Sequence, residues 1–223
     1  MRIILMIITF FLIINSPARS EIKSFEFGGD VYSFEDNSFC KPDPNSPFDR
    51  LFKSLDKVSA NVNNNFPTVF RLAACEEGNV TKIGSVVKPY MYIKKYPLPA
   101  DYQKLSDAVL FEVIKVLLKR EAAQVDTLEQ KKALRKALQA IEDAGLLLKE
   151  ISKMTIVEDN QNRFITSTIV NSDAATSIAL LHPAVANGAV FIIYLSIPTG
   201  FGYDLDTHTD LLHKWASTFK IKN

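Results

Sequence analysis

The richest group of polar side chains lies in the run from Tyr203 to Asp210. If this run is an extended loop, alternate residues lie on one side, and Asp204, Asp206, His208 and Asp210 become neighbours. Carboxylates and imidazoles are common ligands of divalent metal ions. Asp204, Asp206 and His208 are therefore the candidate ligands of a metal site.

A helix start is the alternative explanation of the same run. The EF-hand pattern is not met, because the sixth position lacks Gly and Trp215 stands where the bidentate Glu belongs. As a helix start, Asp206 or Thr207 would be the N-cap, and Asp210 would complement the helix dipole. We expect the capping role, and the sequence predicts neither a metal site nor a cofactor.

Aromatic residues supply the candidate binding residues. Tyr90, Tyr92 and Tyr96 lie at even spacing along one expected strand, and Phe201 and Tyr203 lie in a Gly-containing loop. Tyrosine-rich surfaces are common in protein recognition. Tyrosines are also common in ordinary cross-strand pairs, so both explanations stay open.

No catalytic group of residues is recognisable. His208 and His213 are five residues apart, not the four of a helical zinc pair, and His182 precedes a proline in an expected loop. The chain has no G-x-S-x-G, P-loop or G-x-G-x-x-G pattern. We expect a protein without catalytic chemistry, and a hydrolase that uses the region from Asp204 to His213 is the alternative.

The first twenty residues have the pattern of a cleaved signal peptide. Arg2 precedes an apolar run from Ile3 to Ile14, and the small residues Ala18 and Ser20 follow. The run is shorter than the roughly 20 residues of a membrane-spanning helix. We therefore expect residues 21–223 to form the mature chain, periplasmic or secreted, without stable membrane insertion.

Charge does not favour a nucleic-acid partner. Without Arg2 and Arg19 the chain has 24 basic and 25 acidic residues, a net charge of −1. One basic cluster lies mid-chain, but no aromatic residues are interleaved with it, as single-stranded nucleic acid would require. Its members are Lys119, Arg120, Lys131, Lys132, Arg135 and Lys136. We expect a protein partner instead.

The two cysteines favour a disulfide. Cys40 and Cys75 would both reach an oxidising compartment, and neither has a nearby His or belongs to a C-x-x-C pair. Asn79 begins an Asn-Val-Thr glycosylation sequon, which matters only in a eukaryotic source.

A helical block at residues 99–153 lies between two strand-rich parts of the chain. Leu105–Leu118 is apolar around most of its circumference, and a second helix is expected to open at Thr127. The apolar stripe of the second helix has three- and four-residue spacing and consists of Leu134, Ala137, Leu138, Ile141, Ala144, Leu148 and Ile151. Two antiparallel helices on one sheet face are our preferred arrangement, with a single kinked helix as the alternative.

Strands and short helices are expected on both sides of this block. Before it, the pattern predicts a hairpin of 22–27 with 31–34, a loop at 36–47, a helix at 47–61, and strands at 68–74 and 82–93. After it, the pattern predicts a hairpin of 154–158 with 163–170, a short helix at 172–181, a buried strand at 189–197 and a helix at 206–219. The inward face of the last helix should include Leu212, Trp215 and Phe219.

The last 65 or so residues resemble the C-terminal part of Mog1/PsbP-like domains. The resemblance rests on element order: a hairpin, a buried strand, a Pro-containing loop and a closing helix with Ser217 and Phe219 near its end. It implies an antiparallel sheet with helices on both faces, in a family of mostly non-enzymatic binding proteins.

These observations predict one α+β domain over residues 21–223. It should contain a mainly antiparallel sheet flanked by helices, an inserted central helical pair and a C-terminal helix. The expected function is that of an exported soluble binding or interaction protein.

Overall fold

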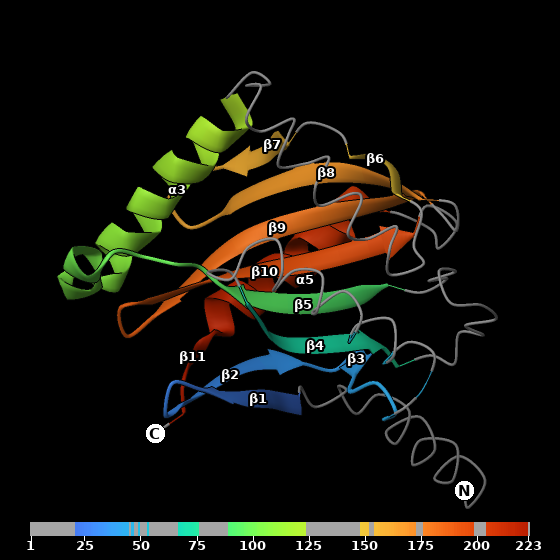
Figure 1. The fold of residues 1–223 in the computed structure, drawn as a ribbon, viewed down its shortest axis with the longest axis horizontal. Helices are drawn as coiled ribbons and strands as arrows, with labels where there is room; N and C mark the ends of the chain where they lie inside the picture. Colours follow the sequence, from blue (N-terminus) through green and yellow to red (C-terminus); the bar gives the residue numbers. More distant parts are fainter. Residues whose placement is uncertain are drawn as a thin grey trace, which may run out of the picture.

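The computed structural model describes residues 21–44, 46, 49, 53, 67–75, 89–123, 148–151, 154–172, 176–198 and 204–222. These residues form two antiparallel sheets and two α-helices, which confirms the expected α+β class with a C-terminal helix (Figure 1). The predicted signal peptide at 1–20, the helix at 47–61 except for Asp49 and Lys53, and most of the second central helix lie outside the described residues.

The larger sheet has eight strands, in the order β3-β4-β5-β10-β9-β8-β6, and β7 also pairs with β8. All of its strand pairs are antiparallel. The strands are β3 Phe39–Cys40, β4 Thr68–Ala74, β5 Tyr90–Lys95, β6 Leu148–Ile151, β7 Thr155–Asp159, β8 Phe164–Ser172, β9 Thr176–Ala186 and β10 Ala189–Pro198.

The smaller sheet joins the two ends of the described chain. Its order is β1-β2-β11, with β1 Glu21–Phe27, β2 Asp30–Asp36 and β11 Lys220–Ile221. The β1–β2 hairpin is the one predicted, and Gly28 and Gly29 have the positive φ angles that its tight turn needs. Figure 1 shows the C-terminus beside this hairpin.

Strand β10 lies in the middle of the larger sheet and is buried on both faces, as its apolar run predicts. Phe191, Ile193 and Leu195 face one core, and Val190 and Ile192 face the other. The first core lies between the larger sheet, the smaller sheet and helix α5, Leu205–Thr218. The second lies under helix α3, Asp107–Ala123.

Helix α3 is anchored at its start by the β9–β10 turn. Asp107 accepts hydrogen bonds from the backbone N–H groups of Asn187 and Gly188, at 3.0 and 2.9 Å. A short 3-10 turn, η1 Ala100–Lys104, precedes the helix. Although the sequence is apolar around most of this helix, the helix is not buried all round, because Val109 and Val116 are exposed.

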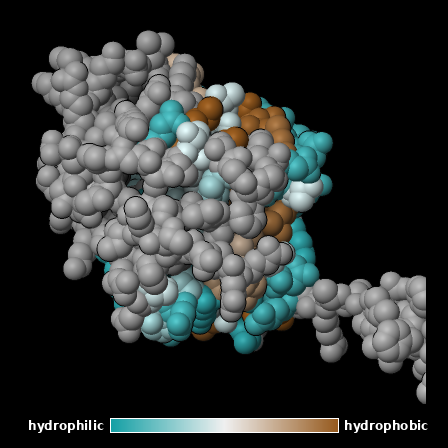
Figure 2. Space-filling model, turned by 90° about the vertical axis from the view of Figure 1, so that its right-hand side faces the viewer, coloured by the Kyte–Doolittle hydropathy of each residue, from teal (hydrophilic) through white to brown (hydrophobic). Residues whose placement is uncertain are grey.

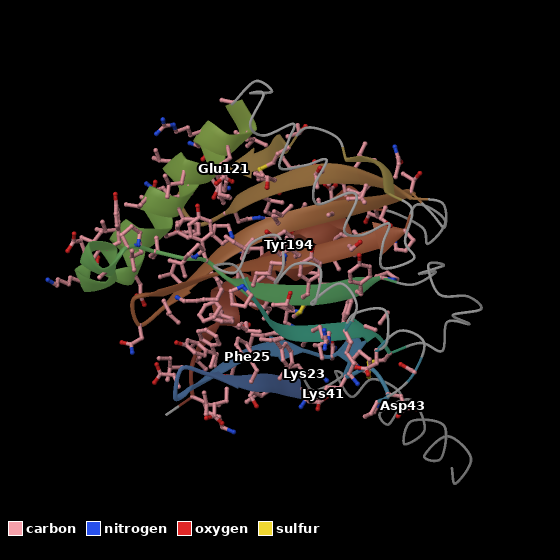
Figure 3. All side chains as sticks on the ribbon, viewed as in Figure 1. Lys23, Phe25, Lys41, Asp43, Glu121 and Tyr194 are labelled. Carbon is pink, nitrogen blue, oxygen red and sulfur yellow. A yellow bond between two sulfur atoms is a disulfide. The ribbon has the colours of Figure 1, made fainter. Side chains whose placement is uncertain are left out.

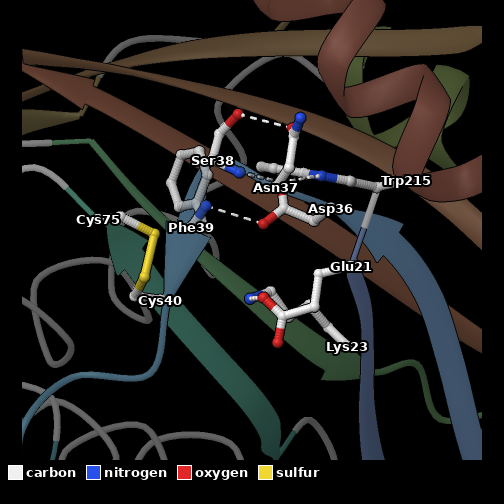
Figure 4. Close-up of polar contacts among 9 residues, drawn as sticks. All are labelled: Glu21, Lys23, Asp36, Asn37, Ser38, Phe39, Cys40, Cys75 and Trp215. Atoms are coloured by element: carbon white, nitrogen blue, oxygen red, sulfur yellow. Dashed lines mark hydrogen bonds and ion pairs between the residues drawn. A yellow bond between two sulfur atoms is a disulfide. The ribbon is translucent and has the colours of Figure 1, made fainter. Parts of the chain in front are cut away.

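The predicted disulfide between Cys40 and Cys75 is present and ties the end of β3 to the residue after β4 (Figure 4). Beside it, the buried carboxylate of Asp36 accepts hydrogen bonds from Trp215 Nε1 at 3.0 Å and from the backbone N–H of Phe39 at 2.8 Å. Helix α5 is thus joined to β2 and to the start of β3 by a single side chain.

Several predicted elements are wrong. The short helix at 172–181 is strand instead, because β9 pairs with both β8 and β10. The second central helix cannot extend to Ile151, since Leu148–Ile151 is strand β6. The loop at 36–47 contains strand β3, and the strand expected at 82–93 is described only as β5, from Tyr90.

The described surface mixes hydrophobic and hydrophilic side chains. Figure 2 shows this on the side of the molecule that lies to the right in Figure 1. The exposed apolar residues include Ile156 on β7 and Ile169 on β8.

Candidate functional site

Three tyrosines form a stacked group on the α3 side of the larger sheet. Strands β5 and β10 pair so that Tyr92 lies opposite Tyr194 and Tyr90 lies opposite Ser196. The Tyr92 and Tyr194 rings are stacked, with centroids 4.5 Å apart and planes 7° apart. Tyr90 stacks on Tyr92 at 6.0 Å. We call Tyr90, Tyr92 and Tyr194 the tyrosine row.

Charged groups border the tyrosine row. Arg71 on β4 is the cross-strand partner of Tyr92, and Lys94 Nζ lies 5.8 Å from the centroid of the Tyr92 ring. Tyr96 lies just beyond β5 and donates its hydroxyl to Glu121 Oε1 on α3 at 3.5 Å. Figure 3 shows Tyr194 in the middle of the sheet and Glu121 on the helix.

Burial keeps these phenols protonated. Desolvation raises the pKa of Tyr92 well above its usual range, with Tyr90 and Tyr194 adding to the shift. Desolvation also raises the pKa of Tyr194, and that of Tyr90 against an opposing hydrogen bond with Ser196. At neutral pH the row therefore offers half-buried aromatic faces and neutral hydroxyl groups, a combination suited to stacking and hydrogen bonding.

The structure brings together only part of the predicted binding set. Tyr90 and Tyr92 share a face as expected, and Tyr92 makes with Tyr194 the cross-strand contact that was the alternative explanation. Phe201 and Tyr203 lie outside the described residues. Tyr194 was missed, because it lies in an apolar run whose pairing with β5 is not evident from the sequence.

The residues from Asp204 to Asp210 form the start of α5, so the helix-start explanation is confirmed. The N-cap is Asp204, not Asp206 or Thr207, and its carboxylate accepts the Thr207 N–H at 3.2 Å. Hydrogen bonds from the Thr207 side chain and backbone lower the pKa of Asp204. Asp206 lies in the first turn, and His208 Nδ1 lies 2.6 Å from the Asp204 carbonyl oxygen.

A second polar group joins β9 to α5. His182 is not in a loop but on β9, with only 1 % of its surface exposed. Its Nδ1 lies 2.6 Å from the Pro183 carbonyl oxygen, and its Nε2 lies 3.4 Å from Nδ1 of His213 on α5. Sequence analysis missed this pair because its members are 31 residues apart.

Three charged residues surround this histidine pair. Arg163 Nη1 donates a hydrogen bond to Asp210 Oδ1 at 2.8 Å. Arg163 Nε lies 2.5 Å from Glu158 Oε2, and the two groups form an ion pair whose angles do not meet those of a hydrogen bond. Burial lowers the pKa of His182 to about 4. Burial and then Arg163 lower the pKa of His213. Both imidazoles are therefore neutral at pH 7.

Comparison with known proteins adds no relative: no family model and no curated protein matches the chain.

Within the described part of the chain, no three His, Cys, Asp or Glu residues are grouped as a metal site would need. No helix among the described residues is long and apolar enough to cross a membrane. The geometry thus defines an α+β protein with an aromatic sheet face and a histidine pair.

Proposed function

We propose that this chain is an exported binding protein without catalytic chemistry, which recognises a protein partner through the tyrosine row. The stacked group of Tyr90, Tyr92 and Tyr194 is the observation that supports it. Tyrosine combines a large apolar face with a polar tip at low cost in side-chain entropy, and it is enriched in protein interfaces. Arg71 and Lys94 beside the row would favour an acidic or aromatic contact on the partner.

The proposed export rests on two further observations. The signal-peptide pattern at 1–20 and the disulfide between Cys40 and Cys75 both suit an oxidising compartment, periplasmic or extracellular. The resemblance to Mog1/PsbP-like domains is part of the same proposal. Its hairpin, buried strand and closing helix correspond to β7–β8, β10 and α5, although strand β9 intervenes.

The hydrolase alternative has less support. At the start of α5 the Asp204 carboxylate accepts the Thr207 N–H, and His208 Nδ1 lies beside the Asp204 carbonyl oxygen, so both residues serve the helix end rather than a substrate. Hydrolysis of an acyl bond would also need an activated nucleophile next to a base, as in a triad.

Affinity capture from an extract of the source cells tests the binding proposal. We expect the wild-type protein to retain a stoichiometric protein partner and the Tyr90→Ala/Tyr92→Ala variant to lose it. Tyr102→Ala is the matched control, because Tyr102 is an exposed tyrosine on η1. Thermal unfolding of each variant separates lost binding from lost folding. Equal retention by the folded Tyr90→Ala/Tyr92→Ala variant would rule out the tyrosine row as the interface.

The export proposal has a separate test. Mass spectrometry of the chain from the periplasm or medium of its source should find Glu21 as the first residue. A full-length chain retained inside the cell would contradict export while leaving the tyrosine row untouched.

A further inference from the structure

The histidine pair joins β9 to α5 by a hydrogen bond that holds one proton between the two rings. Nδ1 of His182 lies 2.6 Å from the Pro183 carbonyl oxygen, so this nitrogen carries the ring proton and donates it. Nε2 of His182 is therefore the acceptor for Nδ1–H of His213, at 3.4 Å. If both rings were fully protonated, two N–H groups would face each other and the bond would be lost.

The surroundings of His182 oppose a positive charge. Only 1 % of its surface is exposed, and β10 places the apolar Ile193 opposite it. Helix α3 contributes the Phe111 ring, whose centroid lies 6.2 Å from that of the His182 ring. An imidazolium at this position would exchange its hydration for mostly apolar neighbours, which costs free energy.

Charged groups face the pair from three other places. Among the described residues these groups are Arg163 just before β8, Glu158 on β7 and Asp210 on α5, and Arg163 forms an ion pair with each carboxylate. Burial is the main cause that lowers the pKa of both histidines, and Arg163 lowers it further. The two carboxylates act in the opposite direction at His213. Arg163 therefore adds to the effect of burial, and the pair is neutral at pH 7.

We infer that the histidine pair is a pH-sensitive contact, which holds α5 on β9 at neutral pH and loosens in mild acid. Protonation of histidine clusters at pH 5–6 changes interfaces in pH sensors in this way. A first extra proton enters at Nε2 of the half-buried His213 and leaves the bond between the rings in place. A second proton has to enter at Nε2 of His182, where it removes the only acceptor of that bond.

The direction of the effect follows from proton linkage. In an unfolded chain histidine has a pKa near 6.5, whereas burial lowers the pKa of His182 in the pair to about 4. Between these two pH values the unfolded chain binds more protons than the folded protein, so stability falls as the pH falls below about 6.5. One proton changes the unfolding constant about tenfold per pH unit. The contact is independent of the tyrosine row, which lies on the α3 side of the larger sheet.

Urea unfolding at pH 7.0 and 5.0 tests the contact, because most carboxylates stay ionised in this range. Trp215, the single tryptophan of the chain, lies on α5 and supplies the fluorescence signal. We expect the unfolding constant of the wild-type protein to rise at least about tenfold more than that of His182→Gln, which keeps an acceptor oxygen but cannot titrate. His208→Gln is the matched control, because His208 lies on the same helix beside the Asp204 carbonyl oxygen. It should keep the full wild-type change.

Nuclear magnetic resonance of the ring nitrogens is a second measurement, which needs no variant and serves if His182→Gln does not fold. At pH 5.0 the ¹⁵N resonances of His182 in the folded protein should still be those of a neutral ring with its proton on Nδ1. A folded protein in which His182 is protonated at pH 5.0 would overturn the proposal. So would a change in stability that is equal in the wild-type protein and in a folded His182→Gln variant.

Discussion

Asp36 is a charged residue whose side chain is fully buried, and its partners explain why the fold retains it. It accepts hydrogen bonds from Trp215 Nε1 and from the backbone N–H groups of Phe39 and Ser38. A buried carboxylate is stable only when its hydrogen bonds are made. The residue therefore fixes where α5 lies on the N-terminal strands.

Replacement of Asp36 by Ala should lower the free energy of unfolding by about 3 kcal/mol, because the Trp215 and Phe39 N–H donors would lose their acceptor inside the protein. Asp36→Asn keeps one acceptor oxygen and should lose less. Urea unfolding measures both, with the exposed Asp43→Ala as control. A loss no larger than in the control would contradict the role of Asp36.

Thr166 is the opposite case. Its hydroxyl is fully buried on β8 and has no hydrogen-bond partner among the residues that the structure describes. Thr166→Val removes this unpaired group at nearly constant volume and should raise the free energy of unfolding by about 1 kcal/mol. Thr168, two residues along the same strand, does have a partner, so Thr168→Val is not expected to stabilise. Equal effects of the two changes in urea unfolding would show that the Thr166 hydroxyl is satisfied.

At the scale of elements, the pairing of β5 with β10 determines the chemistry of the tyrosine row. Two strands that are far apart in the sequence place Tyr92 and Tyr194 opposite each other, and aromatic pairs of this kind contribute about 0.5–1.5 kcal/mol beyond their burial. The tyrosine row is thus a candidate interface and also contributes to the stability of the sheet.

The raised pKa values of the row predict a loss of stability in base. Unfolded tyrosines lose their protons near pH 10, whereas the folded Tyr92 and Tyr194 keep theirs to higher pH. Above about pH 10 the folded state therefore binds more protons than the unfolded state, and stability falls as pH rises. The urea concentration at the midpoint of unfolding, measured between pH 8 and 12, should show this fall. The tyrosinate absorbance of the folded protein should also rise at a higher pH than that of the unfolded chain.

Tyr92→Phe keeps the ring and removes the titrating group, so it should reduce the fall in stability above pH 10. Tyr102→Phe, on the exposed turn η1, is the matched control and should leave the fall unchanged. If the stability of Tyr92→Phe and Tyr102→Phe falls equally above pH 10, ionisation of the tyrosine row is not the cause of the fall.

The elements also show what sequence patterns can and cannot predict. The β1–β2 and β7–β8 hairpins and the buried β10 were predicted, because alternation and an unbroken apolar run are local signals. Strand β9 was mistaken for a helix at 172–181, since its alanines and leucines are good helix formers and its two partner strands override that preference.

A signal for β9 was present in the sequence. Asn187 and Gly188 both have positive φ and form the tight β9–β10 turn, and Asn-Gly is the strongest short-range hairpin pattern. With β9 assigned, His182 would have been placed on a strand facing the core. Its contact with His213 would still have been unpredictable, because it depends on how α5 crosses the sheet.

At the scale of the whole molecule, the disulfide reinforces β3, a strand with only two paired residues. Strand β3 is two residues long, and the bond from Cys40 to Cys75 spans 35 residues of sequence. A Cys40→Ser/Cys75→Ser variant should lose about 3–4 kcal/mol of unfolding free energy, by the chain-entropy estimate for a loop of this length. Urea unfolding of the variant and of the reduced wild-type protein should agree. Unchanged midpoints in both would mean that β3 and β4 are held together by other contacts.

The smaller sheet has a consequence for the order in which the protein can fold. Strand β2 is completed by β11, and further bonds join Glu35 to Thr218 and Val31 to Lys222. A chain emerging from the ribosome produces β2 more than 180 residues before these partners. Until then one edge of the hairpin is open and Phe34 lacks Trp215. The part of the protein that is made first is therefore among the last to reach its final structure.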